Sequence, residues 1–510
     1  MPPLPHGRRV FIKTSASALA LLSVPSVGFG QTTGVRLEWQ QFKTTPQYAS
    51  FLNAVRLMKA NTNAASPSSW AYWTNVHVNY CPHNVAYFFA WHRGYLYYFE
   101  QQLRIVSGDT KLCVPYWDYY KYPNIPAEFT DPSAANPLYM PRAGTNVYNA
   151  LSLAPFAPSV WNFQRGTANA FEPQFESAPH NPVHNLIGGE MAAMTSPRDP
   201  IFYLHHANID RLWHAWALPD GKGIPGTNNP YNAATSNPYW AGTFTYASGL
   251  TMPRYKTYYP GWLNFDYSDN TKPTSLPANS PQANLVQANL VQANLVQANL
   301  VQANLVQAQV EPVLVRPVTG KFAVTSPRAL GGKKRSLGGV SGVVLAEVPA
   351  SAHMPLNAAG LQALKDAISV AVKPPPQIPP ETFRSVVVVL DDLLMLGGGK
   401  KGGYFYKIYI NLPFIGDPAD DRRYLLGTVG AFEVAGASHH GPVTLEYPAT
   451  EVLAQFSASE LQDVTISLVR VNGDNPPRGA VLKLGEVRIE ISTEPAWDSS
   501  PGAGRGQCYC

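Results

Sequence analysis

The chain has 510 residues, of which 14% are charged and 12% aromatic, with 47 prolines and a net charge of +5. Disordered acidic chains are richer in charge and poorer in aromatic residues than this, and the absence of a long basic stripe argues against nucleic acid as the main partner. After the first thirty residues no run of 18 apolar residues occurs, so we expect no internal membrane span.

The first thirty residues have the pattern of an export signal. Arg8 and Arg9 stand ahead of a modestly apolar run, residues 16–22, which is followed by small residues up to Gly30. A paired arginine before a weakly hydrophobic stretch favours a twin-arginine signal over an ordinary secretory one. That route carries folded proteins, so it suits a protein that folds before export. We therefore expect residues 1–30 to be a signal and the protein to be periplasmic or secreted.

Residues 31–275 are rich in Trp, Tyr and Phe, and their apolar residues recur at helical spacing. This pattern predicts a mainly α domain. The apolar spacing predicts one helix over Val85–Val106 and another around Trp70–Val76. Asp199 followed by Pro200 predicts the start of a further helix, because Asp is a favoured N-cap and Pro fits the first helical position.

The character of the chain changes after residue 275. The pentapeptide Ala-Asn-Leu-Val-Gln repeats five times over residues 283–307, and a period of five matches neither a helix nor a strand. We interpret residues 276–310 as a linker. Beyond it, β-branched and aromatic runs bounded by Gly and Pro predict an all-β sandwich domain over residues 311–495 and a flexible tail over 496–510. The predicted strands are Ser385–Leu396, Tyr404–Leu412, Tyr424–Val434, Val464–Val471 and Glu486–Ser492.

Eight of the twelve histidines fall between residues 77 and 214. His180 and His184 are four residues apart, which on a helix places both imidazoles on one face, about 6 Å apart. A zinc protease needs Glu after the first of these histidines, and Asn181 stands there instead.

Two further histidines, His205 and His206, are adjacent in the predicted helix that follows Pro200. They point about 100° apart on that helix, so only one of them can join a given metal. We take His206 as the ligand, with Asp210 one turn on as a carboxylate that orients it or its neighbour, and His205 as a pocket wall or structural residue.

A second group comprises His77, His83 and His92. His92 lies within the predicted helix, His83 approaches from the loop that Pro82 creates, and His77 comes from the end of the preceding helix. Two sets of three imidazoles suit copper, zinc, iron or nickel. The Glu-x-x-His pairs of a ferritin-like di-iron site and the Cys-x-x-Cys-His of a c-type haem are both absent from the sequence.

Four motifs together resemble the tyrosinase family of type 3 copper proteins over residues 35 to about 270: Cys81-Pro82-His83, Phe89–Arg93, His180–His184 and Asp199–Trp213. The resemblance implies a four-helix bundle that holds two copper ions and binds dioxygen side-on between them. It implies that His77, His83 and His92 hold one copper and that His180, His184 and His206 hold the other. Cys81 stands where many members link a cysteine to a histidine through a thioether, the alternative being a buried thiol.

The resemblance also implies the reaction: ortho-hydroxylation of small phenolic substrates such as tyrosine, and oxidation of o-diphenols to o-quinones. A catechol oxidase or aminophenol oxidase without hydroxylase activity stays open, as does a dioxygen carrier, against which the single copy of the site argues. The C-terminal region resembles the β-sandwich that covers the copper site of plant-type members and keeps them latent until cleaved. A copper-delivery or export partner remains open, and the sequence does not identify the residue that covers the site.

Hydroxylation requires that the phenol lose its proton near the metals. Asn181 is placed to fix a water and Glu176, four residues before His180, to polarise it. Glu172 is the second candidate for that carboxylate, and an exposed loop acid without a role is the alternative for either glutamate. The resemblance places Ala193 at the gate above the metals and Asn185 against the substrate.

Overall fold

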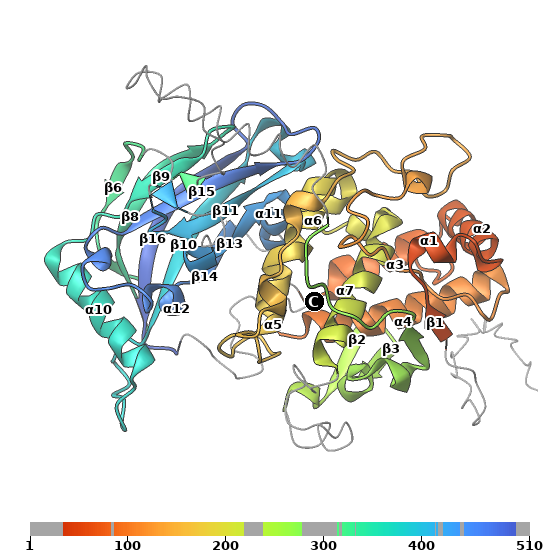
Figure 1. Cartoon of the computed structure of the whole chain (residues 1–510), viewed down its shortest axis with the longest axis horizontal. Helices are drawn as coiled ribbons and strands as arrows, with labels where there is room; N and C mark the ends of the chain where they lie inside the picture. Colours follow the sequence, from red (N-terminus) through yellow and green to blue (C-terminus); the bar gives the residue numbers. More distant parts are fainter. Residues whose placement is uncertain are drawn as a thin grey trace, which may run out of the picture.

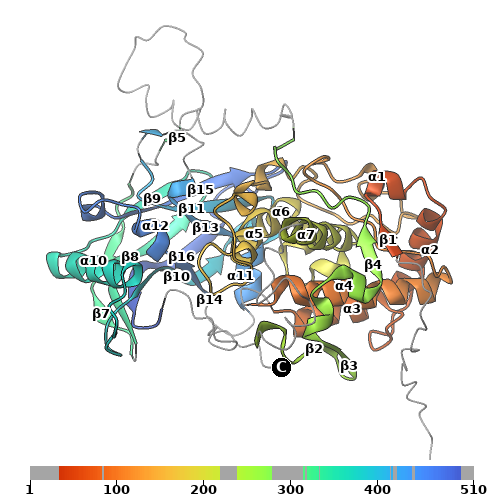
Figure 2. The ribbon, with the colours of Figure 1, turned by 60° about the horizontal axis from the view of Figure 1, so that its bottom comes forward.

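The computed structural model describes residues 34–82, 86–218, 238–277, 314–315, 319–331, 333–413, 415–416, 422–438 and 443–495. The predicted signal, His83, nearly all of the predicted linker and the tail lie outside these residues. A helical body and a β-rich body lie side by side (Figures 1 and 2). Among the described helices, none has the length and hydropathy to cross a bilayer.

The first body is mainly α-helical, as expected. Helix α4 packs against α2 and α7, and the interior is filled by aromatic side chains, including six Trp that are at most 2% exposed between residues 39 and 216. The helices are α1 (Trp39–Phe42), α2 (Gln47–Ala60), α3 (Trp70–Tyr80), α4 (Phe88–Ser107), α5 (Phe171–Phe175), α6 (Asn181–Ile187) and α7 (Ile201–Ala217). Two short sheets complete it: β1 (Gly34–Arg36) with β4 (Phe265–Tyr267), and β2 (Thr243–Ala247) with β3 (Leu250–Pro253).

The predicted helix boundaries shift for local reasons. Helix α4 begins at Phe88 rather than Val85, since Tyr87 adopts a left-handed φ of 86° that an α-helix cannot include. Helix α7 begins at Ile201 with Pro200 as its N-cap, so the predicted start is one residue early, and the Asp199 carboxylate accepts a hydrogen bond from the Ile201 N–H at 3.1 Å.

A buried charge network ties the two ends of this domain together. Arg36 of β1 donates to Glu100 of α4 at 3.0 Å, and Arg93 of α4 donates to Asp210 of α7 at 2.6 Å. The second carboxylate oxygen of Asp210 accepts from the Tyr267 hydroxyl. The expectation that Asp210 orients a histidine is therefore wrong, because both of its oxygens are used to join α7 to α4 and β4.

The second body is the expected sandwich, and its sheet pairings are antiparallel. One sheet runs in the order β14 (Val443–Pro448), β10 (Ser385–Met395), β16 (Leu482–Ser492), β8 (Lys334–Leu345) and β6 (Ala323–Thr325), with β7 (Arg328–Ala329) also on β8. The other runs β13 (Leu425–Gly430), β11 (Tyr404–Ile410), β15 (Thr465–Asn472) and β9 (Ala350–His353). A separate pair joins β5 (Leu314–Val315) to β12 (Ile415–Gly416).

The sandwich is accompanied by helices, which the strand signals alone did not predict: α10 (Ala358–Val372), α11 (Ala431–Ala437) and α12 (Thr450–Leu453). The predicted strand Tyr424–Val434 is correct only as far as Gly430. There the chain turns into α11, because the Glu433 carboxylate accepts a hydrogen bond from the Gly430 N–H at 2.9 Å and so starts the helix.

The sandwich, which we call the cap domain, docks on the helical domain through several loops, and α11 contacts α6 and lies beside it (Figure 1). The Asp474 carboxylate accepts from the Thr145 N–H at 2.7 Å, the Thr145 hydroxyl at 3.0 Å and the Asn146 N–H at 3.2 Å. Gly402 has a φ of +71°, and a Cβ at this position would lie 2.7 Å from the Asn185 carbonyl oxygen. The glycine-rich loop thus permits a close approach between the domains.

Candidate metal centre

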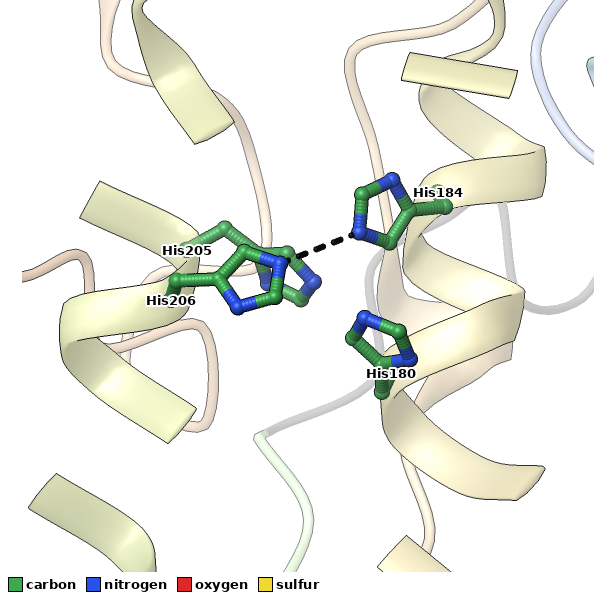
Figure 3. Close-up of side chains that lie close together, drawn as sticks. All are labelled: His180, His184, His205 and His206. Carbon is green, nitrogen blue, oxygen red and sulfur yellow. Dashed lines mark hydrogen bonds between the residues drawn. The ribbon is translucent and has the colours of Figure 1, made fainter. Parts of the chain in front are cut away.

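The second group of predicted ligands comes together between two helices. His180 precedes the first residue of α6 and His184 lies in its last turn, and both face His205 and His206 of α7 (Figure 3). All four are at most 1% exposed, and each offers a ligand nitrogen within 4.8 Å of those of the others. The Nε2 atoms of His184 and His206 are 3.4 Å apart. The ring of His205, predicted as a pocket wall, lies parallel to that of His180 at 5.6 Å.

The first group of predicted ligands adjoins the second. His77 comes from the last turn of α3 and His92 from α4, and their ring centroids are 5.7 Å apart. The His92 ring stacks on that of His206 at 4.3 Å, which makes the two groups neighbours. His83 lies outside the described residues, so its place as the third ligand stays a prediction.

Cys81 is buried beside this first group, with its Sγ 3.4 Å from Nε2 of His92. The buried thiol therefore borders the histidines. A bond to His83 concerns a residue outside the described part of the chain.

Four of the histidines are oriented by an oxygen at the ring nitrogen Nδ1. These oxygens are carbonyls, which only accept hydrogen bonds, so each Nδ1 carries the proton and each Nε2 is the basic nitrogen that binds a metal. The pairs are His77 with Met194 O (2.9 Å), His92 with Phe88 O (2.7 Å), His184 with Met191 O (2.7 Å) and His180 with Asn181 Oδ1 (2.7 Å).

The surroundings of His205 and His206 favour the neutral imidazole. Burial lowers the pKa of His205 and His206 well below the usual value, and the neighbouring imidazoles lower it further. Neutral imidazole is the form that binds metals. Five of the six predicted ligands are thus buried and adjacent, and this all-imidazole donor set fits two copper ions.

The two candidate carboxylates are both buried, so neither is an exposed loop acid. Glu176 forms an ion pair with Arg165. Glu172 accepts from the Arg165 N–H at 2.9 Å and from the Tyr239 hydroxyl at 3.4 Å, and burial raises its pKa to about 7. Asn181, expected to fix a water, places its carbonyl oxygen on His180, so part of its role is to orient a ligand.

The residue that covers the site is Phe432 of α11, which the sequence did not reveal. Its ring stacks on that of His184 at 4.0 Å and 13° and lies 5.5 Å from that of His180. Asn185, expected to contact substrate, contacts the cap domain instead: its Oδ1 accepts from the Phe432 N–H at 2.9 Å, and its Nδ2 donates to Glu433 at 2.7 Å. The Glu433 that begins α11 is the sequence signal that was available, but nothing in it specifies where α11 docks.

Ala193, the expected gate residue, lies at the boundary between the domains. It lines a cavity of about 580 Å³ together with Ala431 and Val434 of the cap domain. The neighbouring Met194 supplies the carbonyl that orients His77.

Protein-family models match two segments of the chain. A family model described as "Common central domain of tyrosinase" matches residues 57–153 and 133–218, and a model of pentapeptide repeats matches residues 282–311 with eight copies. The repeat match covers the predicted linker, which lies outside the described residues.

Among curated proteins, tyrosinase HcTyr1 of Hahella sp. (strain CCB-MM4) is 33% identical over 187 residues, covering 29% of this chain and 40% of that protein. The tyrosinase of Streptomyces glaucescens is 30% identical over 191 residues, covering 29% of this chain and 69% of that protein. Polyphenol oxidase C, chloroplastic, of Solanum lycopersicum is 25% identical over 265 residues, covering 39% and 42%. The matched region therefore spans less than half the length of two of these three relatives.

Solved structures match over most of the chain. A latent apple tyrosinase aligns with a TM-score of 0.47 and 18% identity over 91% of this chain and 98% of that one. A recombinantly expressed latent aurone synthase aligns with a TM-score of 0.49 and 17% identity over 91% and 90%.

Proposed function

This chain belongs to the tyrosinase family of type 3 copper proteins, and we propose that it is a two-copper oxidoreductase that uses dioxygen to hydroxylate monophenols at the ortho position and to oxidise o-diphenols to o-quinones. The observation that carries the proposal is the convergence of buried histidines from α3, α4, α6 and α7, four of them with Nδ1 bound to an oxygen. The proposed ligands are His77, His83 and His92 for one copper and His180, His184 and His206 for the other.

The bound copper ions would supply the redox chemistry that activates dioxygen. The protein positions the phenol: the face of His184 on which Phe432 now stacks is a platform for an aromatic ring. We propose that a water held between Asn181 and Glu176 accepts the phenolic proton, with Arg165 fixing the carboxylate.

The cap domain is proposed to keep the enzyme latent, because the Phe432 ring takes the place on His184 that a substrate ring needs. Cleavage in the repeat segment 283–307 would release the cap domain from the covalent chain. The paired Arg8 and Arg9 support the further proposal that the protein is exported.

One observation favours a second candidate, a catechol oxidase without hydroxylase activity. The Glu176 carboxylate is already engaged by Arg165, so one of its oxygens is not available to polarise a water. Oxidation of a catechol makes a smaller demand on this carboxylate than hydroxylation of a monophenol.

The test is oxygen uptake by the copper-loaded protein on tyrosine and on 4-methylcatechol, before and after limited proteolysis within residues 278–313. The proposal predicts oxidation of both substrates and a rise after cleavage. Oxidation of the catechol alone would establish the second candidate. Oxygen uptake on neither substrate, with copper bound, would refute both candidates.

A further inference from the structure

The group that covers the metal centre is a peptide whose contacts form a pattern. The Phe432 ring occupies the face of His184, the Phe432 N–H donates to Asn185 Oδ1 at 2.9 Å, and the Glu433 carboxylate accepts from Asn185 Nδ2 at 2.7 Å. Asn185 is 0% exposed, and Phe432 and Glu433 are 4% and 5% exposed. Both ends of one buried amide are thus bound by an aromatic residue and by the acidic residue that follows it.

The rim around this amide is also adapted to a polypeptide. The main-chain oxygen of Asn185 accepts from the Gly403 N–H at 2.7 Å, and that of Ser177 accepts from the Thr428 hydroxyl at 3.0 Å. When the cap domain moves away, these oxygens and the Asn185 amide lose their partners. A bare phenol carries neither the N–H nor the carboxylate that bind the Asn185 amide, whereas a peptide with an aromatic residue followed by an acidic residue supplies both.

We propose that the uncovered site takes a tyrosyl residue within a peptide, directly followed by an acidic residue, and that Asn185 reads this pair. The tyrosyl N–H would donate to Asn185 Oδ1 and the next carboxylate would accept from Asn185 Nδ2. This inference rests on the proposed function. One tyrosyl phenol and one dioxygen give one o-quinone and one water: one oxygen atom bonds to the ortho carbon, and the other leaves as water with the phenolic hydrogen and the displaced ring hydrogen.

A simpler role for Asn185 is that of a latch that only holds the cap domain closed. The two roles differ in what they do to the choice of substrate. Loss of a latch raises the open population and so changes the rate on every substrate by one factor. Loss of a residue that contacts the substrate changes the ratio of kcat/KM between two substrates. The open population affects both substrates equally and therefore cancels from this ratio.

The experiment uses the full-length, copper-loaded protein that carries Phe432→Gly, which removes the covering ring. Four probes are compared by kcat/KM: acetyl-Ala-Tyr-Glu-amide, the same peptide with Gln for Glu, the same peptide with an N-methylated tyrosine, and 4-methylphenol. The first is expected to exceed the Gln and N-methyl peptides by about tenfold or more, mainly through KM, because each of these lacks one contact with Asn185. Adding Asn185→Ala is expected to reduce these ratios to about one. The matched control is Asn149→Ala, which removes a different contact between the domains, the Asn149 donation to the Asn472 carbonyl at 3.2 Å, and should preserve the ratios.

Binding gives a readout that needs no turnover. The unreactive peptide acetyl-Ala-Phe-Glu-amide is expected to bind the Phe432→Gly protein in calorimetry about tenfold more tightly than its Gln analogue, and Asn185→Ala should abolish the difference. Equal kcat/KM values for the peptides in the parent protein, or a preference that survives Asn185→Ala, would overturn the inference while oxidation of 4-methylphenol upheld the proposed function. If the copper-loaded protein oxidises neither 4-methylphenol nor 4-methylcatechol, both this inference and the proposed function are overturned.

Discussion

Phe432→Ala is expected to activate the full-length protein. The ring is 4% exposed and stacks on His184 at 4.0 Å, so only the closed arrangement loses stabilisation when it is removed. Burial of a Phe side chain contributes about 1.5–3 kcal/mol, and an aromatic pair adds about 0.5–1.5 kcal/mol. A loss of about 3 kcal/mol lowers the closed-to-open ratio by on the order of a hundredfold, since 1.4 kcal/mol is a factor of ten.

The assay is oxygen uptake with 4-methylcatechol at saturating concentration, on protein samples matched for copper content. The rate of the Phe432→Ala protein should rise by a factor approaching one hundred as long as the closed form dominates. Phe432→Leu retains much of the bulk but loses the stacked ring, so its rate should fall between those of the parent and the Ala variant. An unchanged rate in Phe432→Ala at equal copper content would refute the reasoning that this ring closes the site.

Four further predictions test other parts of the structure. His206→Asn and His77→Asn should each lower the copper content from about two ions per chain to about one by metal analysis, because each removes a proposed ligand, and an unchanged content would remove that histidine from the ligand set. Glu176→Gln and Asn181→Ala should slow tyrosine hydroxylation about tenfold more than catechol oxidation, since only the monophenol needs the proton acceptor; equal losses on both substrates would exclude this role. Asp474→Ala deletes the acceptor of three hydrogen bonds between the domains, worth about 1 kcal/mol each, and should raise activity about tenfold or more. The same change at the exposed Asp463 is the control and should leave the activity unchanged. Equal rates for the two variants would count against the Asp474 contact. Glu172→Gln should stabilise the protein at pH 8 and have little effect at pH 5. Burial raises the pKa of Glu172 from 4.5 to about 7, so the folded protein loses up to about 3 kcal/mol of stability as pH rises through this window. Thermal unfolding curves at the two pH values test this, and an equal shift of the unfolding temperature at both would contradict the raised pKa.

Local spacing predicted much of the metal centre. The four-residue separation of His180 and His184 placed both rings together because the chain between them is helical, and their centroids are 4.6 Å apart. The start of α7 was likewise predicted to within one residue from a local signal, and Asp199 accepts a hydrogen bond from Ile201, two residues away.

Features set by distant segments were missed or misjudged. Local sequence does not reveal the partners of Asp210, because Arg93 and Tyr267 are 117 and 57 residues away. Phe432 reaches His184 only through the docking of two domains, which hydrophobic periodicity does not encode. Apolar residues continue past Gly430, so the strand pattern does not mark the start of α11. That start depends on the Glu433 carboxylate, which accepts a hydrogen bond from the Gly430 N–H.

Copper stoichiometry with ligand identification tests the central claim most directly. The full-length protein is reconstituted with copper and dialysed, and X-ray absorption is recorded at the copper edge. We expect about two copper ions per chain, each surrounded by imidazole nitrogens. A chain that retains no copper after reconstitution would contradict the assignment of these histidines to a dicopper centre.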